Sequence, residues 1–476
     1  MLSAYGNKET ITPNFERLAK QCAVFDGFYC GSLPCMPARR EIQTGRYNFL
    51  HRSWGPMEPY DKSVFQLLGE AGIYTHFVSD HDHYWQEGGL NYHNRFTTYE
   101  FIRGQEGDSW KGDVLGYEGV RNNRRQDRIN RQHMQDEEQH PHVRAFRAGM
   151  EFLEKNWEKD NWHLHLEYFD PHEPFFAPEK YRKMYDVNSE GVDWPPYSPV
   201  ENGDDAREYR KNYCALLTMC DTYLGYILDF LDEHDMWKDT LLTVNTDHGF
   251  LLGEHGYFAK NYMPTYEEIS HLPFFLWDPE SGARNVRKPQ LSQTIDIAPT
   301  LLDYHHLPIP EQMQGRSMLP AVRCDEEVRS YALFGSFGKH VNITDGRYVY
   351  MRAGRNENLN YYTIMPTHIF TPFTVKELRR CDRTLTDEFS FTDGVPLMRI
   401  PASSADAPDN SCYHYERHMA LGDLLFDLKE DPDQTQECAD PAVLQMMKKA
   451  LIREMMNSEA PKEQYDRLGI DMEEVG

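Results

Sequence analysis

The segment spanning residues 30–46, CGSLPCMPARREIQTGR, holds the residues best suited to covalent chemistry. Cys35 stands two residues before Pro37 and four before Arg39, a spacing that the other cysteine of the segment lacks. If Pro37 ends an extended segment and Ala38 begins a helix, Arg39 points back toward the thiol. A lone cysteine is ordinarily a buried structural thiol, and that alternative stays open. We predict that Cys35 is the reactive centre.

His172 lies in the segment DPHEPF, residues 170–175, which follows a strand predicted at 163–169. Prolines on both sides of His172 restrict the backbone, so its imidazole is held in one direction. The alternative is a histidine that only caps a turn. The position at the carboxyl end of a strand favours a functional histidine.

Asp247 and His248 follow a strand at 240–245, which we predict to be central in its sheet, and Lys260 comes shortly after them. A hard cation prefers carboxylate oxygen, and an imidazole can complete its coordination shell. Asp247 and His248 are therefore candidate metal ligands. Taken alone, Lys260 would be an ordinary solvent-exposed lysine, and this alternative stays open.

His81 and His83 lie in the sequence SDHDHY, at the end of a strand predicted at 75–79. As alternating residues at a strand end, the two imidazoles would point the same way, toward a ligand. We predict that they contact the substrate. A surface turn or a second metal site are the alternatives.

The elements that must position these residues are strands alternating with helices through residue 320. This order predicts an α/β fold with a large, mostly parallel sheet sandwiched by helices and a site at the strands' carboxyl ends. Beyond it we expect a smaller C-terminal α+β subdomain on an antiparallel sheet, with strands at 331–337 and 348–352 joined by the turn Asp345-Gly346. We predict a catalytic domain at residues 1–322 and a C-terminal subdomain at residues 323–476. Within the subdomain, we predict a substrate-shaping insertion at about residues 354–421.

Composition excludes several classes of protein. A net charge of −26 argues against a nucleic-acid partner, because phosphate binding needs a basic face. No apolar run reaches the roughly 18 residues that a membrane span requires, and no leader-like segment opens the chain. Nine cysteines without a CxxC pair are typical of free thiols in a reducing compartment, so we expect a cytoplasmic protein.

Several motifs together resemble the type I sulfatases of the alkaline phosphatase superfamily. These are CMPAR at residues 35–39 with the TGR that follows, TPNFERLA at residues 12–19, DPHEP at 170–174 and TDHG at 246–249. The resemblance covers most of the chain and implies the family's fold and sulfuric ester hydrolysis. It also implies that a formylglycine-generating enzyme oxidises Cys35 to formylglycine. As a hydrate, formylglycine offers one hydroxyl for attack on sulfur and a second that expels sulfate.

The resemblance assigns roles to the other candidates. It implies that Arg39 orients the nucleophile, that Lys260 binds the sulfate and that His172 assists departure of the alcohol. Asp247 and His248 match the family's metal pair, with Ca²⁺ the expected ion and Mg²⁺ the alternative. A sulfated carbohydrate is the expected substrate, and nothing in the sequence fixes the oligomeric state.

The chain departs from the family pattern at two places. The family's first strand, with its metal-binding acidic residues, has no counterpart in this sequence, so an N-terminally truncated chain with impaired metal binding is one alternative. The family's Gly-Lys-x-His segment is replaced around Asp80, which leaves His81 and His83 as substitutes. A phosphonate monoester or phosphodiester hydrolase of the same superfamily is therefore the second alternative.

Overall fold

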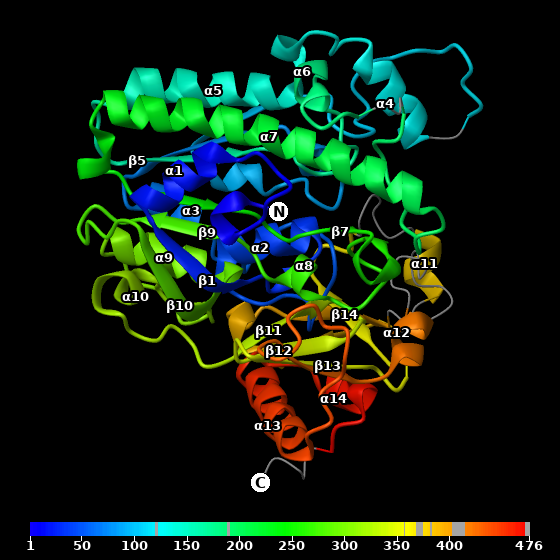
Figure 1. The fold of residues 1–476 in the computed structure, drawn as a ribbon. Helices are drawn as coiled ribbons and strands as arrows, with labels where there is room; N and C mark the ends of the chain where they lie inside the picture. Colours follow the sequence, from blue (N-terminus) through cyan, green and yellow to red (C-terminus); the bar gives the residue numbers. More distant parts are fainter. Residues whose placement is uncertain are drawn as a thin grey trace.

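The structure is a computed structural model of the whole chain. It describes residues 1–119, 122–187, 191–356, 358–367, 375–380, 383–401 and 415–471. Strands and helices alternate through the first two-thirds of the chain, and a second layer of strands and two helices forms its lower part (Figure 1).

Two sheets form the body of the molecule. The first has the order β10-β1-β9-β6, with strands Val286–Gln293, Ala23–Tyr29, Phe274–Trp277 and Leu242–Asn245. The second has the order β4-β3-β5, with strands Thr98–Phe101, Tyr74–Ser79 and Trp162–Glu167, all parallel. In the first sheet β9 runs antiparallel to both of its neighbours. The predicted α/β class is confirmed, and the expected sheet comes in two parts, in which β6 and β5 are edge strands.

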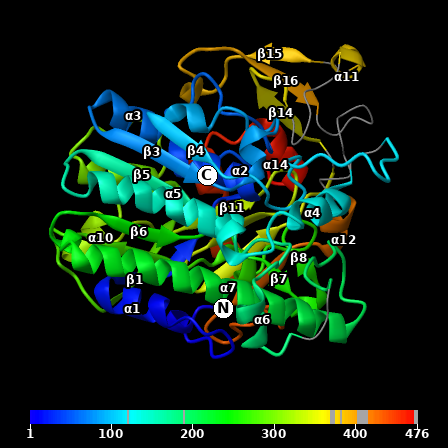
Figure 2. The ribbon, with the colours of Figure 1, turned by 90° about the horizontal axis from the view of Figure 1, so that it is seen from above.

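Helices cover both faces of these sheets (Figures 1 and 2). One face carries α1, α5 and α7, at Pro13–Gln21, Pro141–Asn156 and Gly203–Glu233. The other carries α2, α3, α9 and α10, at Cys35–Thr44, Val64–Glu70, Ile297–Tyr304 and Leu319–Cys324. Helix α7 is long and apolar enough to span a membrane, but 61% of its most apolar window is buried inside the molecule. It is a core helix, packed against α1, α5 and α6 (Glu179–Lys183).

A five-stranded sheet lies below the body. Its order is β17-β13-β12-β11-β2, with strands Leu424–Asp427, Tyr348–Arg352, Val341–Thr344, Ala332–Ser336 and Ser32–Leu33. Helix α13, Pro441–Asn457, packs on it, and α14, Lys462–Leu468, joins the same apolar cluster. The turn Asp345-Gly346 joins β13 to β12, not to β11, so the predicted pairing of 331–337 with 348–352 was wrong. Strand β12 was not predicted from the sequence.

The region predicted as an insertion is described in part. Strands β14, β15 and β16, at Asn360–Thr363, Thr384–Thr386 and Leu397–Pro401, form a small antiparallel sheet. Helices α11 and α12 lie at Val375–Arg380 and Tyr415–Leu421, and residues 368–374 and 402–414 lie outside the described part. Tyr361 of β14 donates a hydrogen bond to the Trp54 carbonyl at 2.7 Å, which ties this sheet to the body.

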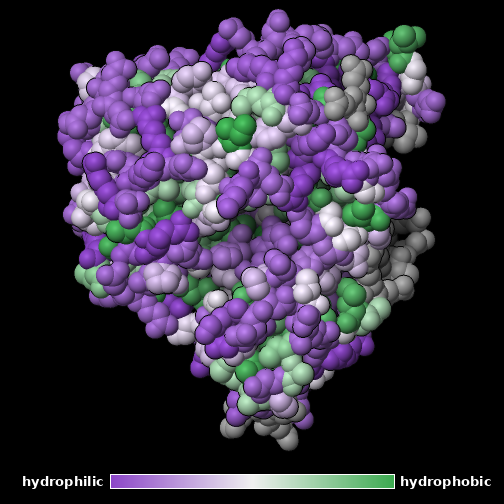
Figure 3. All heavy atoms as spheres, in the orientation of Figure 1, coloured by the Kyte–Doolittle hydropathy of each residue, from purple (hydrophilic) through white to green (hydrophobic). Residues whose placement is uncertain are grey.

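The remaining short elements are α4, α8, β7 and β8, at Asn123–Arg131, Glu267–Ser270, Leu251–Leu252 and Phe258–Ala259. Hydrophilic side chains dominate the face drawn in Figure 3, and its hydrophobic residues are scattered in small groups. Such scattered apolar groups are ordinary for a protein surface.

Candidate active site

Cys35 is the first residue of α2 and follows directly after β2, which belongs to the lower sheet. The helix begins at Cys35, so the prediction that Ala38 begins it was wrong. Pro37 fits in this first turn because the amide groups there have no partner within the helix. Arg39 lies one turn later, and its Nη1 donates to the Cys35 carbonyl at 3.2 Å. The side chain of Arg39 points back toward residue 35, as predicted.

Arg39 connects three parts of the site. Its Nε donates to Glu167 Oε2 at 3.0 Å, and its Nη1 makes a short ion pair with Asp247 Oδ2. Glu167 ends β5 and Asp247 follows β6, so one guanidinium spans the edges of both sheets. Burial raises the pKa of the Asp247 carboxyl, but His248 and Arg39 outweigh it and bring the pKa well below its usual range. Asp247 is therefore ionised at neutral pH.

Two of the predicted residues contact the Cys35 sulfur, and a third contacts one of these two. His248 Nε2 lies 3.2 Å from Sγ and His172 Nε2 lies 3.9 Å from it. Lys260 donates to the same His172 nitrogen at 2.6 Å. Burial raises the pKa of the thiol, but Lys260 and His172 outweigh it, and the pKa lies below the ordinary value. This is a setting in which a cysteine is reactive rather than an inert core thiol.

The group formed by Cys35, Asp247 and His248 has the donor chemistry of a cation site, with ligand atoms that all lie within 4.8 Å of one another. His248 Nδ1 faces the Gly249 carbonyl at 2.9 Å, and a carbonyl only accepts, so Nδ1 carries the proton. The lone pair on Nε2 then faces Asp247 Oδ2 at 3.4 Å, a repulsive contact that a cation between the two would relieve. Burial lowers the pKa of His248 to about 4, so the ring is neutral. Asp247 and His248 would therefore suit a divalent cation as ligands.

Glu173 holds the opposite side of the site. Its Oε2 lies 3.2 Å from His172 Nδ1 and 3.7 Å from Lys260 Nζ. Burial lowers the pKa of Lys260, but Cys35 and Glu173 outweigh it, and the pKa is raised above the ordinary value. The lysine is buried and charged, unlike the exposed lysine that was the alternative.

His81 and His83 lie beside this group, but not for the reason predicted. Strand β3 ends at Ser79, and His83 lies in a single 3₁₀ turn, Asp82–Trp85, that begins after His81. Strand alternation therefore does not set their directions. Neither ring nitrogen of the fully buried His81 has a hydrogen-bond partner among the described residues. His83 Nδ1 donates to Gln86 Oε1 at 2.6 Å, which leaves Nε2 as an acceptor.

Sequence analysis missed three acidic residues of the site. Glu167 and Glu173 pair with Arg39 and Lys260, and Glu106 lies with Asp82 and His83 in a second group whose ligand atoms are within 4.8 Å. Glu173 had a visible signal, because it directly follows His172 and stands between the same prolines. Glu167 and Glu106 carry no spacing that distinguishes them from other acids in the chain.

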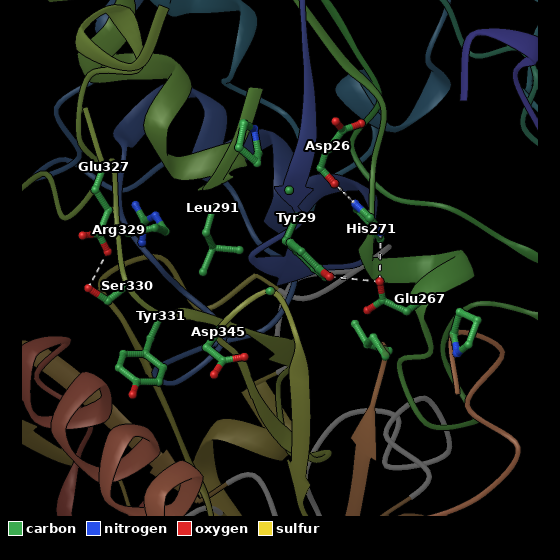
Figure 4. A pocket seen from close by; sticks show the side chains of 15 residues that line it. Asp26, Tyr29, Glu267, His271, Leu291, Glu327, Arg329, Ser330, Tyr331 and Asp345 are labelled. Atoms are coloured by element: carbon green, nitrogen blue, oxygen red, sulfur yellow. Dashed lines mark hydrogen bonds and ion pairs between the residues drawn. The ribbon is translucent and has the colours of Figure 1, made fainter. Parts of the chain in front are cut away.

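A cavity of about 800 Å³ lies elsewhere in the molecule (Figure 4). It opens between β1 and the lower sheet, and none of the eight predicted site residues lines it. On its wall, Tyr29 donates to Glu267 at 2.9 Å, and His271 Nδ1 lies 2.9 Å from the same carboxylate oxygen. Tyr29 and His271 therefore engage the same oxygen of Glu267.

The fold and the site define an α/β enzyme whose reactive groups meet at the carboxyl ends of its strands. A family model described as "Sulfatase" matches residues 1–307, and one described as "N-sulphoglucosamine sulphohydrolase, C-terminal" matches residues 253–362. The chain belongs to the sulfatase family of the alkaline phosphatase superfamily, as predicted, and is a hydrolase of sulfuric esters.

Curated relatives agree with this assignment. An arylsulfatase of Clostridium perfringens is 24% identical over 362 residues, which span 67% of this chain and 74% of that protein. A choline-sulfatase of Rhizobium meliloti is 26% identical over 397 residues, or 71% of this chain and 73% of that protein. An N-acetylglucosamine-6-O-sulfatase of Bacteroides thetaiotaomicron is 31% identical over 116 residues, or 24% of this chain and 20% of that protein.

Solved structures share the fold. One, in complex with D-glucosamine-2-N,6-O-disulfate as its substrate, superposes with a TM-score of 0.65 at 14% identity, over 97% of this chain and 96% of that one. A phosphonate monoester hydrolase of Silicibacter pomeroyi superposes with a TM-score of 0.61 at 17% identity, over 94% of this chain and 91% of that one.

Proposed function

We propose that the protein cleaves a sulfate ester of a carbohydrate at residue 35, after conversion of Cys35 to formylglycine. The observation that carries this proposal is the convergence of His248 and His172 on the Cys35 sulfur, with Lys260 hydrogen-bonded to His172. A carbohydrate is supported by the N-acetylglucosamine-6-O-sulfatase among the relatives and by the disulfated glucosamine in a structure of the same fold.

The side chains of this site have different roles in the proposed reaction. Formylglycine, as its hydrate, supplies one hydroxyl for attack on sulfur and a second for release of the sulfate. Lys260 binds the sulfate oxygens as a buried cation, and Arg39 holds residue 35 against Asp247. His172 Nε2 accepts a hydrogen bond from the Lys260 ammonium, so the proton for the oxygen of the departing alcohol comes from Lys260 and passes through His172 Nε2, which leaves Lys260 neutral.

Asp247 and His248 would hold the divalent cation. Bound there, it would lower the pKa of the attacking hydroxyl and neutralise charge on the sulfate. We propose Ca²⁺, with Mg²⁺ as the alternative, because Mg²⁺ is commonly held by one or two carboxylates with substrate oxygens and water. Titration of Asp247→Asn with each ion by calorimetry tests this assignment. Affinity unchanged from the wild type would contradict it.

The test of the proposed function needs protein made together with a formylglycine-generating enzyme. A peptide containing residue 35 should then be lighter, because an oxygen replaces the sulfur and two hydrogens of the cysteine. Cys35→Ala should lose hydrolysis of an aryl sulfate by at least about 10³-fold, since nucleophile and base act as a unit. An active protein in which residue 35 is unmodified cysteine would contradict the proposal.

Phosphonate monoester hydrolysis is the second candidate, because a phosphonate hydrolase shares the fold and this chain has Asp80 where the family's lysine is expected. In the structure Asp80 is fully buried and accepts hydrogen bonds from Gln105 and the Phe169 amide. It therefore offers no contact to an anion. Assays with matched aryl sulfate and aryl phosphonate esters separate the two candidates by kcat/KM.

A further inference from the structure

Tyr197 is an exposed tyrosine whose hydroxyl is turned into the active site. The residue is 43% exposed, yet its hydroxyl donates a short hydrogen bond to Glu173 Oε1, and Glu173 is only 2% exposed. The other oxygen of this carboxylate lies 3.2 Å from His172 Nδ1 and 3.7 Å from Lys260 Nζ. A single side chain, that of Glu173, therefore separates Tyr197 from the groups proposed to act on the sulfate ester.

This orientation is the reverse of the usual one for a surface tyrosine. A tyrosine at a surface ordinarily packs its ring against the protein and leaves its hydroxyl in water. Because the Tyr197 hydroxyl is buried against a carboxylate, the exposed area belongs to the ring and the backbone. Burial and then Glu173 raise the pKa of this hydroxyl well above its ordinary value, so it keeps its proton and donates. The ring therefore presents apolar surface to solvent directly beside the site.

The backbone on both sides of Tyr197 is tied to the segments that carry the active-site residues. The Ser198 carbonyl accepts from the amide of Phe258, which belongs to the strand just before the buried lysine of the site. On the other side, the Asp193 carbonyl accepts from the Phe175 amide at 2.6 Å. Two prolines directly before Tyr197 restrict the chain between these points. The position of the ring is therefore fixed relative to the site.

The ring of Phe250 links Tyr197 to Lys260. Tyr197 packs against it at a near-perpendicular angle of 81°, with 6.3 Å between the ring centroids. The Lys260 ammonium lies 5.8 Å from the centroid of the same Phe250 ring. Tyr197 and Lys260 are thus one aromatic ring apart, a separation that a sugar ring and its sulfate group can span.

We propose that the exposed ring of Tyr197 is a platform on which the sugar ring of a sulfated pyranoside stacks while Lys260 binds its sulfate. The inference rests on the proposed function and narrows its substrates to sugars with a C–H face free for stacking. A pyranose has such an apolar face, and an aromatic ring buries apolar area with a defined geometry. Tyr197 is then a binding residue that discriminates between alcohols, and its bond to Glu173 fixes the platform.

A quaternary ammonium substrate is the other class of ligand that an aromatic face attracts. Such cations are recognised by cages in which several rings surround the charge. Among the residues that the structure describes, Tyr197 makes one ring contact, with Phe250, and that contact is near-perpendicular. The arrangement therefore favours a flat apolar sugar face, and choline sulfate is the contrasting probe.

Binding to the Cys35→Ala protein, with Ca²⁺ present, tests the platform without any turnover. The probes are a panel of O-sulfated pyranoses that includes N-acetylglucosamine 6-sulfate, together with choline sulfate and inorganic sulfate. In this background Tyr197→Leu should raise the Kd of the best-bound sugar sulfate about tenfold, whereas Tyr197→Phe, which keeps the ring, should stay within about threefold. Inorganic sulfate has no ring, so its Kd should change by less than about twofold in either variant.

Tyr226→Leu is the matched control. Tyr226 is a 50% exposed tyrosine on α7 that packs against Phe146 and Tyr223, and its replacement should leave every Kd unchanged. The Kd of inorganic sulfate also shows whether each variant keeps the site folded. Because binding needs no hydrolysis, an inactive wild type would refute the proposed function and leave the role of the ring decided.

Three results would overturn the proposal. One is an equal weakening of sugar sulfate and inorganic sulfate by Tyr197→Leu, which would mean that Tyr197 only supports Glu173. The second is a Kd for the sugar sulfate that rises as far in Tyr197→Phe as in Tyr197→Leu. The third is a Cys35→Ala protein that binds none of the sulfated sugars, or that binds choline sulfate more tightly than all of them.

Discussion

Glu173 is the residue whose charge most directly supports the cationic side of the site. It lies between His172 and Lys260, and it contributes to the raised pKa of Lys260. Glu173→Gln removes this negative charge while keeping the shape of the side chain. Lys260 should then lose its proton at lower pH, so the alkaline limb of kcat against pH should shift to lower pH. We expect kcat to fall about tenfold to a hundredfold.

The measurement is a full pH profile of aryl sulfate hydrolysis. Glu179→Gln, on the exposed surface of α6, is the control and should leave the profile unchanged. An alkaline limb that stays at the wild-type pH in Glu173→Gln would show that this carboxylate does not act through Lys260.

The planar guanidinium of Arg39 makes several hydrogen bonds in different directions, which the ammonium group of a lysine cannot reproduce. The guanidinium contacts Glu167, Asp247 and the Cys35 carbonyl at once. Arg39→Lys should lose at least one of these contacts, leaving a buried carboxylate without its partner at a cost of about 1–3 kcal/mol. Urea unfolding should show this loss, and kcat should fall by at least about tenfold. The exposed Arg207→Lys is the control, and equal midpoints for the two variants would contradict the prediction.

At the scale of single residues, the sequence indicated the site residues that lie in short motifs with other distinctive residues. Cys35, His172 and Asp247 were singled out because a proline, a glycine or a second functional residue stands beside each. Glu167 was not, because a single glutamate near a strand end is common. Its partnership with Arg39 depends on the contact between two segments 128 residues apart, which spacing alone does not encode.

Helix α2 is the element that sets the position of Cys35, and it is buried along its whole length. Glu41, fully buried on this helix, contacts Ser32 of β2 and accepts from Thr294 at 3.0 Å. A side chain at Gly31 would meet the Glu41 carboxylate at 2.2 Å, so a glycine is required where the chain passes this helix. Burial raises the pKa of Glu41 to about 8, which means that the carboxyl is largely protonated at neutral pH.

Glu41→Gln should therefore be tolerated and should change the pH dependence of stability. The raised pKa means that wild type loses this contribution as pH rises from about 4.5 to about 8, with a slope of at most about 1.4 kcal/mol per pH unit. The free energy of unfolding of Glu41→Gln relative to wild type should rise across this range and level off above it. Glu70→Gln, at the exposed end of α3, should give a flat difference. A flat difference for Glu41→Gln too would mean that Glu41 is ionised.

Strands with a clear apolar pattern were predictable from the sequence, but the strands that they pair with were not. The strands predicted at 75–79, 163–169 and 240–245 agree with β3, β5 and β6 within a few residues. Nothing in the sequence of β9 indicates that it runs antiparallel to β1 and β6, because direction depends on the connections between strands. For the same reason β6, predicted to be central, has one neighbour in its sheet.

At the scale of the whole molecule, the lower sheet holds the segment that leads to Cys35. Strand β2 pairs with β11, and the Gly335 amide donates to the Gly31 carbonyl at 2.9 Å. The predicted boundary at residues 322 and 323 stays a prediction, but this pairing means that the C-terminal part helps to form the site. Residue 35 is therefore placed by the body and the lower sheet together.

The side chain of Gln293 links the body of the molecule to the lower sheet. Its Nε2 donates to the carbonyls of Cys30 at 2.9 Å and Leu333 at 2.8 Å, and its Oε1 accepts from Tyr47 and from Arg329. The side chain is fully buried, so water cannot replace these bonds. Gln293→Leu keeps most of the volume but removes all four of these hydrogen bonds, and Arg329 Nη1 retains only its contact with the Tyr47 hydroxyl at 3.3 Å. We expect a loss of about 2–5 kcal/mol in the free energy of unfolding, together with a lower kcat, because the Cys30 carbonyl lies just before the reactive segment.

Gln290→Leu is the matched control, since it changes the same residue type on the same strand, β10. Gln290 donates one hydrogen bond, to the Asp325 carbonyl at 3.2 Å, and this bond does not involve the carbonyls of Cys30 or Leu333. Its replacement should cost less than about 1 kcal/mol and leave kcat unchanged. Urea unfolding of both variants, followed by tryptophan fluorescence and by activity, measures the difference. Equal midpoints would mean that the two parts are joined by their apolar contacts alone, and that the bonds of Gln293 do not set the position of residue 35.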